Sequence, residues 1–380
     1  MTISIPCQRD LFDIPDDVAW LNCAQMSPTM RSVAEAGEAA IRRKEHPWTI
    51  SPVDFFTDSE IARGLFADVV NANPDEVAIV PSASYGMAIA AQNLSVGPDN
   101  RILVLDEQFP SNLYVWSELA KRTGARIDVV PRPDDDDWTA AILNRIGPDI
   151  AIAALPNNHW TDGGLIDLEQ IGAALRDVGA ALAVDATQSL GAMPFDVRRV
   201  RPDFLVAACY KWMLGPYSLG FLYVDPKHHA GQPIEHNWIT RAGSEDFSDL
   251  VNYRDDYQPG ARRFDMGERA NFGLMPQAIA ALRQILDWGV DNIQATLSAR
   301  TGEIAARARG MGIDSVSQGL RAGHFLGLRF EGGVPEGLGA RLAAEKIHIS
   351  VRGASVRVTP HLYTNDEDIE RFFDALGRAP

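Results

Sequence analysis

Residues Ala207 to Val224 read AACYKWMLGPYSLGFLYV, and they predict two buried strands joined by a turn. The first apolar run ends in Tyr210-Lys211-Trp212, and a Gly-Pro turn separates it from the second. A lysine at the end of a core strand is costly to bury as an ammonium ion, because the charge loses its hydration. Lys211 therefore indicates either a structural ion pair or a neutral amine that condenses with a carbonyl group.

Apolar runs bounded by turn residues recur on both sides of this stretch. Most are continuously apolar instead of alternating, which is typical of strands covered on both faces. Several are separated by segments of helix length, such as LIDLEQIGAALRDVGA. This pattern predicts an α/β fold with a predominantly parallel, seven-stranded sheet. The expected strands lie in EVAIVPSAS, RILVLDEQFP, ARIDVVPRP, DIAIAALPNN, AALAVDATQS, DFLVAACYK and LGFLYVDP.

The pattern changes after about residue 225. A long, polar, aromatic-rich stretch runs to about residue 273, and loops of that length are usually functional or interfacial. Helices are expected near 275–310, then strands in HFLGLRFE, IHISVRG and SVRVTP. A last helix is expected from Thr364, with Glu367 completing a capping box, to about Gly377. We predict an N-terminal segment (1–20) that packs on the small domain, a large domain (21–265) and a small C-terminal α+β domain (266–380).

Composition limits the classes of function. The 380 residues include 51 acidic and 35 basic ones, and the net charge of −16 disfavours nucleic acids and anionic membranes as partners. The sequence predicts no signal peptide and no membrane span, so we expect a cytoplasmic protein. Three widely spaced cysteines and eight histidines show no metal-ligand spacing. The acidic run 134–137 is interpreted as a solvated loop.

Candidate site residues follow the predicted strands, because ligands of such sheets bind beyond the carboxyl ends of the strands. Residues 81–86 (PSASYG) are small and hydroxylated and enter a helix, which suits a phosphate. Phe109 either stacks on a flat ring or belongs to the core. Asp185 either pairs with a protonated ring nitrogen or caps the next turn. Gln188 would reach another polar group of such a ring.

Further candidates would contact a substrate. Arg357 lies among apolar neighbours in SVRVTPHLYT, and it either binds a carboxylate or bridges the domains. His159 and Trp160 follow a predicted strand and either line the pocket or pack within a loop. A phosphate-binding turn, a stacking ring, an aspartate, a reactive lysine and an arginine together form the set of groups that pyridoxal phosphate chemistry uses.

The segment from Val184 to Val224, VDATQSLGAMPFDVRRVRPDFLVAACYKWMLGPYSLGFLYV, resembles the class V aminotransferase family of fold type I pyridoxal phosphate enzymes. That family includes cysteine desulfurases, kynureninases and isopenicillin N epimerase. The resemblance extends from about Leu21 to the C-terminal SVRVTPHLYTNDEDIERFFDAL. It implies that Lys211 forms the Schiff base and that Arg357 binds the substrate α-carboxylate. The cofactor contacts that it implies come from Ala83, Ser84, Tyr85, Phe109, Asp185, Gln188 and Tyr210.

The resemblance also implies a homodimer whose sites are completed by the partner subunit. Trp238 and Asn271, within 236–273, are the expected contacts. Gly267-Glu268 departs from the Gly-Thr that often occurs in the family, and a carboxylate there would repel a phosphate. Phe109 stands where many members stack a histidine on the pyridine ring, and a phenylalanine there resembles kynureninase and some other members.

The resemblance implies an aminotransferase acting on an amino acid. A lyase of the C–S or kynureninase-like kind is the second hypothesis, and an epimerase is a further outcome of the same chemistry. Cysteine desulfurase activity is not expected, because that reaction needs a cysteine in the C-terminal domain and the last one here is Cys209. A cofactor-binding regulator without catalysis is disfavoured by the full set of catalytic residue types. The sequence does not identify the substrate.

Overall fold

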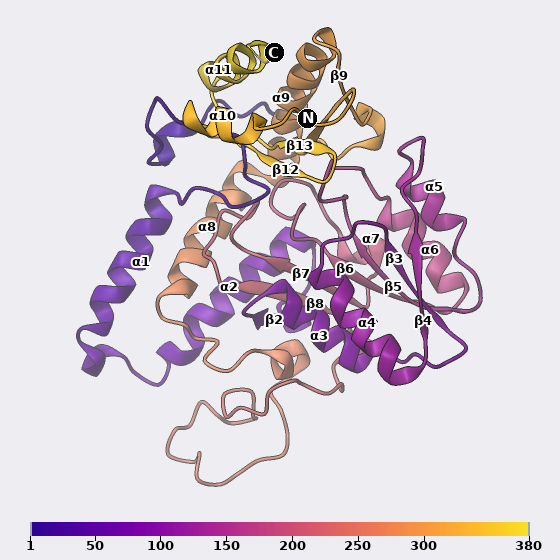
Figure 1. Ribbon diagram of the computed structural model, residues 1–380. Coiled ribbons are helices and arrows are strands. Elements are labelled where there is room, and N and C mark those ends of the chain that lie inside the picture. Colours follow the sequence, from indigo (N-terminus) through magenta and orange to yellow (C-terminus); the bar gives the residue numbers. More distant parts are fainter. Residues whose placement is uncertain (1, 379–380) are drawn as a thin grey trace.

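A seven-stranded sheet forms the centre of the larger part of the chain in the computed structural model, which describes residues 2–378 (Figure 1). The strand order is β2-β8-β7-β6-β5-β3-β4. Only β8 is antiparallel to its neighbours; the other pairings in this sheet are parallel. The predicted fold class and strand number are confirmed. The strands are β2 (Val77–Val80), β3 (Arg101–Leu105), β4 (Arg126–Val130), β5 (Ile150–Pro156), β6 (Ala181–Asp185), β7 (Phe204–Ala208) and β8 (Gly220–Val224).

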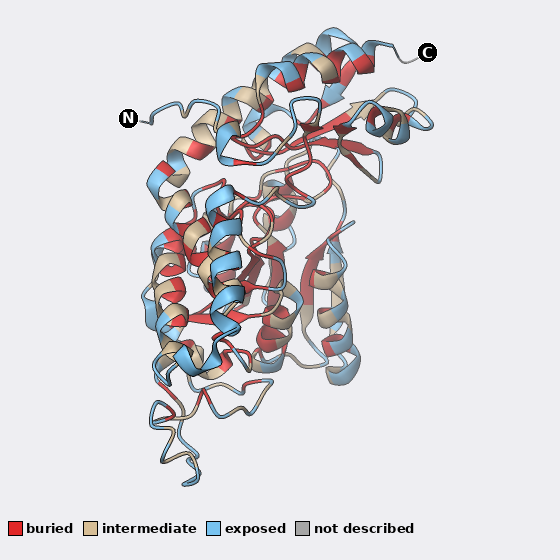
Figure 2. Ribbon diagram, turned by 90° about the vertical axis from the view of Figure 1, so that its left-hand side faces the viewer, coloured by how far each residue is buried: buried red, intermediate tan, exposed pale blue. Residues whose placement is uncertain are grey.

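Helices cover both faces of this sheet, and for this reason its strands other than the partly exposed edge strand β4 are mostly apolar along their length. Val77 and Ile79 of β2 join the core on one face, whereas Ala78 and Val80 join the core on the other. Figure 2 shows the buried sheet between its helical layers. The first face packs against α2 (Asp54–Val70), α5 (Trp138–Leu143), α6 (Leu168–Asp177), α7 (Val197–Val200) and α8 (Leu274–Trp288). The second face packs against α3 (Ala83–Asn93) and α4 (Ser111–Thr123).

A second, antiparallel sheet of four strands lies in the C-terminal part, in the order β12-β13-β10-β9 (Figure 1). The run IHISVRG, predicted as one strand, is divided between two sheets, because β1 near the N-terminus pairs with its first residues. The strands are β1 (Ala19–Trp20), β9 (Ile313–Ser315), β10 (Leu326–Phe330), β11 (Ile347–His348), β12 (Ser350–Arg352) and β13 (Ser355–Val358). The remaining helices are α1 (Arg31–Lys44), α9 (Val290–Gly310), α10 (Leu338–Ala344) and α11 (Asp366–Gly377).

The predicted start of the last helix was wrong by one residue. Asn365, not Thr364, is the cap, since its side chain accepts the Asp368 N–H at 2.8 Å. The Asp368 carboxylate accepts the Asn365 N–H at 3.2 Å and also pairs with Arg9 at 2.8 Å. The Arg9 contact joins residues far apart in the chain, so the local pattern could not indicate it. The Thr364 hydroxyl instead accepts a hydrogen bond from the His361 N–H.

The N-terminal segment lies against the C-terminal part of the chain. The Gln8 N–H donates to the carbonyl of Leu362 at 2.8 Å, and β1 runs parallel to β11. Helix α8 contributes Met275 and Leu282 to the core of the large sheet, whereas the chain beyond it enters the small sheet. The domain boundaries after residues 20 and 265, between the N-terminal segment, the large domain and the small domain, stay predictions.

The irregular region expected after residue 225 contains two short 3₁₀ helices, at Pro226–His228 and Gly260–Phe264. Part of it extends from the body at the bottom of Figure 1. In the acidic run 134–137, Asp136 pairs with Arg329 at 2.8 Å and Asp137 caps α5, so the run is not only a solvated loop. Within residues 2–378, no cluster of His, Cys, Asp and Glu suits a metal ion, and no helix has the length and hydrophobicity of a membrane span.

Candidate active site

A cavity of about 390 Å³ opens where the parallel strands end. Its volume lies within the range of about 300–1,000 Å³ that is typical of small-molecule sites. Strands β2, β3, β5, β6 and β7 all deliver their carboxyl ends to this edge of the sheet, as expected for a doubly wound fold. The cavity is lined by Pro81, Ser82, Ala83, Ser84, Gln108, Phe109, Ser111, Asn112, Pro156, Asn158, His159, Trp160, Asp185, Thr187, Gln188, Ala208, Tyr210, Lys211, Tyr217, Ser218 and Leu219.

Lys211 lies just beyond β7 and is only 6% exposed. Its Nζ is 5.5 Å from the ring centroids of both Phe109 and Tyr210. Within residues 2–378, no carboxylate lies within 4.0 Å of this Nζ. Burial lowers the pKa of Lys211 to about 8, although the negative charge of Asp185 opposes the change. Of the two readings of this lysine, the structural ion pair is therefore excluded within the described chain, and the reactive amine is favoured.

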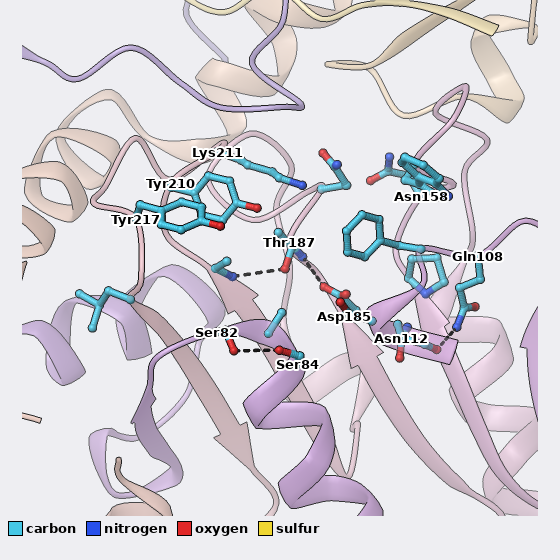
Figure 3. A pocket seen from close by; sticks show the side chains of 18 of the residues that line it. Ser82, Ser84, Gln108, Asn112, Asn158, Asp185, Thr187, Tyr210, Lys211 and Tyr217 are labelled. Carbon is cyan, nitrogen blue, oxygen red and sulfur yellow. Dashed lines mark hydrogen bonds between the residues drawn. The ribbon is translucent and has the colours of Figure 1, made fainter. Parts of the chain in front are cut away.

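Asp185 is the last residue of β6 and is also buried. Its carboxylate accepts the Thr187 N–H at 3.0 Å, and the Thr187 hydroxyl accepts the Ala208 N–H at 3.2 Å. Figure 3 shows Thr187 below the end of the Lys211 side chain and Asp185 below Thr187. Burial raises the pKa of Asp185, and no basic side chain of residues 2–378 lies within 4.0 Å of it. A cationic N–H group in the cavity would stabilise this carboxylate in its charged form.

The first turn of α3 forms a cradle for an anion. Ser82 caps this helix by accepting the Tyr85 N–H, and the Ser82 and Ser84 hydroxyl oxygens are 2.9 Å apart. N–H groups of a first helical turn lack intrahelical partners and attract negative charge. A Cβ at Gly86 would come within 2.6 Å of Val206, so glycine allows α3 to approach the sheet this closely.

Tyr85, the third residue expected in this cradle, does not line the cavity. Its side chain packs beside the core on the second face of the sheet. Burial and the nearby Glu235 carboxylate raise the pKa of Tyr85. Tyr210 does line the cavity, and its ring lies 4.6 Å from that of Tyr217. Tyr210 and Tyr217 are thus the tyrosines that line the cavity.

Gln188 and Phe109 both line the cavity, as the sequence predicted. The Gln188 side chain is oriented by two bonds: its amide donates to the Ala24 carbonyl at 3.0 Å and accepts the Trp212 indole N–H at 3.1 Å. Phe109 is 39% exposed and meets Trp160 edge to face, with centroids 5.3 Å apart. The exposed ring of Phe109 is thus available for stacking on a flat ligand.

Arg357 is 2% exposed on β13. Its Nε donates to the Ser350 hydroxyl at 2.8 Å, and one terminal nitrogen donates to the Trp160 carbonyl at 3.2 Å. Within the described chain, no carboxylate pairs with it. Burial lowers the pKa of Arg357 to about 9, with a smaller contribution from Arg352. A buried guanidinium without a counterion is a natural partner for a substrate carboxylate.

His159 and Trp160 differ in the burial and hydrogen bonding of their side chains. The His159 ring is fully buried and stacks on Trp138, with centroids 4.9 Å apart. One ring nitrogen bonds to the Asp106 carbonyl at 3.0 Å and the other to the Thr161 hydroxyl at 2.8 Å. Its polar atoms are thus engaged within the protein. Trp160 is partly exposed and donates its indole N–H to the Glu107 carbonyl.

Trp238 and Asn271 do not line the cavity of their own chain. Trp238 packs against Phe55 and Phe247, and the Asn271 side chain accepts the Leu274 N–H at the start of α8. Glu268 is exposed, and its backbone is left-handed with a φ of 58°.

Sequence reasoning missed Tyr217 and Ser218 as cavity residues. They occupy the turn between β7 and β8, and the antiparallel pairing of these strands brings the turn back to the cavity edge. The Gly-Pro pair after Lys211 could have indicated this return.

The donor set fits pyridoxal phosphate. A buried amine, a buried carboxylate without a cationic partner and a hydroxyl-lined helix start surround one cavity (Figure 3). These groups match the carbonyl, the ring nitrogen and the phosphate of that molecule. The cavity residues that would hold it are Ser82, Ala83, Ser84, Phe109, Asp185, Gln188, Tyr210 and Lys211.

Comparison with known proteins agrees with this fit. The family model "Aminotransferase class-V" matches residues 39–372. The "Uncharacterized aminotransferase YcbU" of Bacillus subtilis is 30% identical, over 84% of this chain and 83% of its own length. These matches confirm the resemblance that the sequence motifs indicated.

Solved structures share the fold at low identity. Cysteine desulfurase from Thermococcus onnurineus NA1 superposes with a TM-score of 0.81 at 20% identity, covering 98% of each chain. A mutant of C-DES, with glycine covalently linked to its pyridoxal phosphate cofactor, has a TM-score of 0.88 at 18% identity. That alignment covers 98% of this chain and 100% of C-DES.

Proposed function

The chain belongs to the class V aminotransferase family, and on this premise we propose that it is an aminotransferase acting on an amino acid. Pyridoxal phosphate is the family's cofactor, and when bound it supplies an electron sink and a carbonyl group that carries the amino group. The observation that carries the proposal is the single buried amine of Lys211 in the cavity.

Transamination requires one base that removes a proton from the substrate α-carbon and returns it one position away on the same side. Lys211 suits this role because burial lowers its pKa from 10.5 to about 8, so that far more of its Nζ is neutral at neutral pH than in an exposed lysine. The rings of Phe109 and Tyr210 flank this Nζ, with their centroids 5.5 Å away. Arg357 would hold the substrate carboxylate and thereby orient the α-carbon toward Lys211.

A lyase is the second candidate, and the specific observation that favours it concerns Tyr210. Its ring centroid lies 5.5 Å from the Lys211 Nζ, so its hydroxyl, which carries a proton at neutral pH, could donate that proton to a leaving group near this amine. Epimerisation instead needs a second proton donor on the opposite side. His159 lines the cavity, but both of its ring nitrogens are engaged in hydrogen bonds within the protein. Its imidazole is therefore not free to act as this second donor.

We do not propose cysteine desulfurase activity. Cys23 and Cys209 are buried, and burial raises the pKa of both thiols, which makes them poor nucleophiles. Cys7 is exposed in the N-terminal segment, and none of the three lines the cavity. We further propose a homodimer in which residues 236–273, including Trp238 and Asn271, reach the site of the other subunit.

The test is an absorbance titration of the purified holoenzyme with a panel of amino acids and no acceptor. An aminotransferase loses its visible absorption band lastingly and releases at most one equivalent of keto acid. Addition of a keto acid should then restore the band. A band that persists while keto acid and ammonia accumulate over many turnovers would replace aminotransferase with lyase.

A further inference from the structure

Two arginines share one face of the hairpin formed by β12 and β13. Ser350 lies opposite Arg357 and Arg352 lies opposite Ser355 in the antiparallel register. Opposed residues, and residues two apart, share a face of a sheet, so Arg352 and Arg357 are diagonal neighbours. Val356, on the other face, belongs to the buried core of the small sheet. Both guanidinium groups therefore start from the face that is turned away from this core.

This face lies next to the rim of the cavity, although neither arginine is among the residues that line the cavity. Arg357 donates to the carbonyl of Trp160, which lines the cavity. Gly353, at the turn of the hairpin, lies so near the loop after β3 that a Cβ on it would be 3.7 Å from the Glu107 carboxylate. The next residue in that loop, Gln108, lines the cavity. Besides burial, the charges of Arg357 and Arg352 both lower the pKa of Lys211, as expected for cations near the amine.

Neither arginine has a counterion. Within residues 2–378, no carboxylate lies within 4.0 Å of either guanidinium group. Arg352 is half-buried and donates only to the carbonyl of its neighbour Val351 at 2.8 Å. Glu107, an acid on this rim, is already paired with Arg132 at 2.9 Å. One substrate carboxylate on Arg357 would leave Arg352 without a partner.

We propose that Arg352 binds a second anionic group of the substrate, so that the preferred substrates are amino acids with an acidic side chain. The inference rests on the proposed function, in which Arg357 takes the α-carboxylate. The backbone positions of diagonal neighbours on a sheet are roughly 7–8 Å apart, so two long arginine side chains that start from them can converge on the two carboxylates of aspartate or glutamate. The planar guanidinium binds a carboxylate through two parallel hydrogen bonds.

The experiment compares the holoenzyme with Arg352→Gln. A matched control is Arg309→Gln, which removes an exposed, unpaired arginine from the end of α9. The amino acids are L-aspartate and L-glutamate, with L-asparagine and L-glutamine as neutral isosteres. We expect Arg352→Gln to raise KM for the acidic pair about tenfold and to change KM for the neutral pair by less than about twofold. The control should change neither.

A second readout does not depend on turnover. Isothermal titration calorimetry of the holoenzyme measures the affinity for succinate and glutarate against butyrate. We expect tighter dicarboxylate binding in the wild type and a loss of about tenfold in Arg352→Gln, to the level of the monocarboxylate. If no amino acid reacts but this loss is observed, the anion site stands and the proposed function fails. If amino acids react and Arg352→Gln binds dicarboxylates like the wild type, the inference is wrong and the proposed function stands.

Discussion

Replacement of Lys211 by methionine should stabilise the cofactor-free protein at neutral pH. The pKa of this buried lysine falls from 10.5 to about 8, which corresponds to about 3 kcal/mol lost by the folded state when the amine is charged. Methionine keeps a similar unbranched stem without the charge. Because Asp185 then loses the attraction of the ammonium group, the net gain should be about 1–3 kcal/mol.

The pH dependence has a definite sign. The folded protein releases the Lys211 proton at about pH 8, whereas the unfolded chain holds it up to about pH 10.5. Between these values the unfolded state binds more protons, so the stability of the wild type rises with pH relative to Lys211→Met. Below about pH 8 the advantage of Lys211→Met is constant, and above it the advantage shrinks.

The assay is urea unfolding of both proteins after removal of the cofactor, at neutral pH and at steps through this window. Lys44→Met is the control, because Lys44 is exposed at the end of α1 and its loss should change stability by less than about 0.5 kcal/mol. A Lys211→Met protein that is less stable than the wild type at neutral pH would refute the reasoning. A stability difference between the two proteins that stays constant from about pH 8 to about pH 10.5 would also refute it.

Three further substitutions test other parts of the account. Asp185→Asn should lower pyridoxal phosphate affinity and turnover, the latter by about 100-fold, because a neutral amide cannot balance a cationic ring nitrogen; absorbance titration and kcat check this. Arg357→Gln should raise KM for amino acids roughly 30-fold with unchanged cofactor affinity, and an unaltered KM would disprove its role. Asp265→Asn should destabilise the protein by about 3–5 kcal/mol in urea unfolding, because Arg63 and Arg269, both buried, lose their shared carboxylate.

Much of the large sheet could be predicted from the sequence, because its strands are covered on both faces and read as short apolar runs. The cavity could be located for a related reason: parallel strands end at one edge, so Asp185 and Lys211 had to approach each other. For this reason, many of the residues that directly follow the strand ends line the cavity.

Contacts between distant residues explain what the local patterns did not predict or left open. IHISVRG is divided because β1, from the N-terminal segment, pairs with only its first residues. The ring of His159 stacks on Trp138, and Tyr85 lies near Glu235; in both cases the partner is remote in sequence. Local patterns reveal where a backbone segment ends, but not which distant group will hold its side chain.

The central claim is that Lys211 is the residue that binds pyridoxal phosphate. It is tested most directly by reducing the holoenzyme with sodium borohydride and mapping the labelled lysine by peptide mass spectrometry. We predict a single labelled peptide that contains Lys211, and no label in Lys211→Met. A label on another lysine, or none after saturation with the cofactor, would contradict the account.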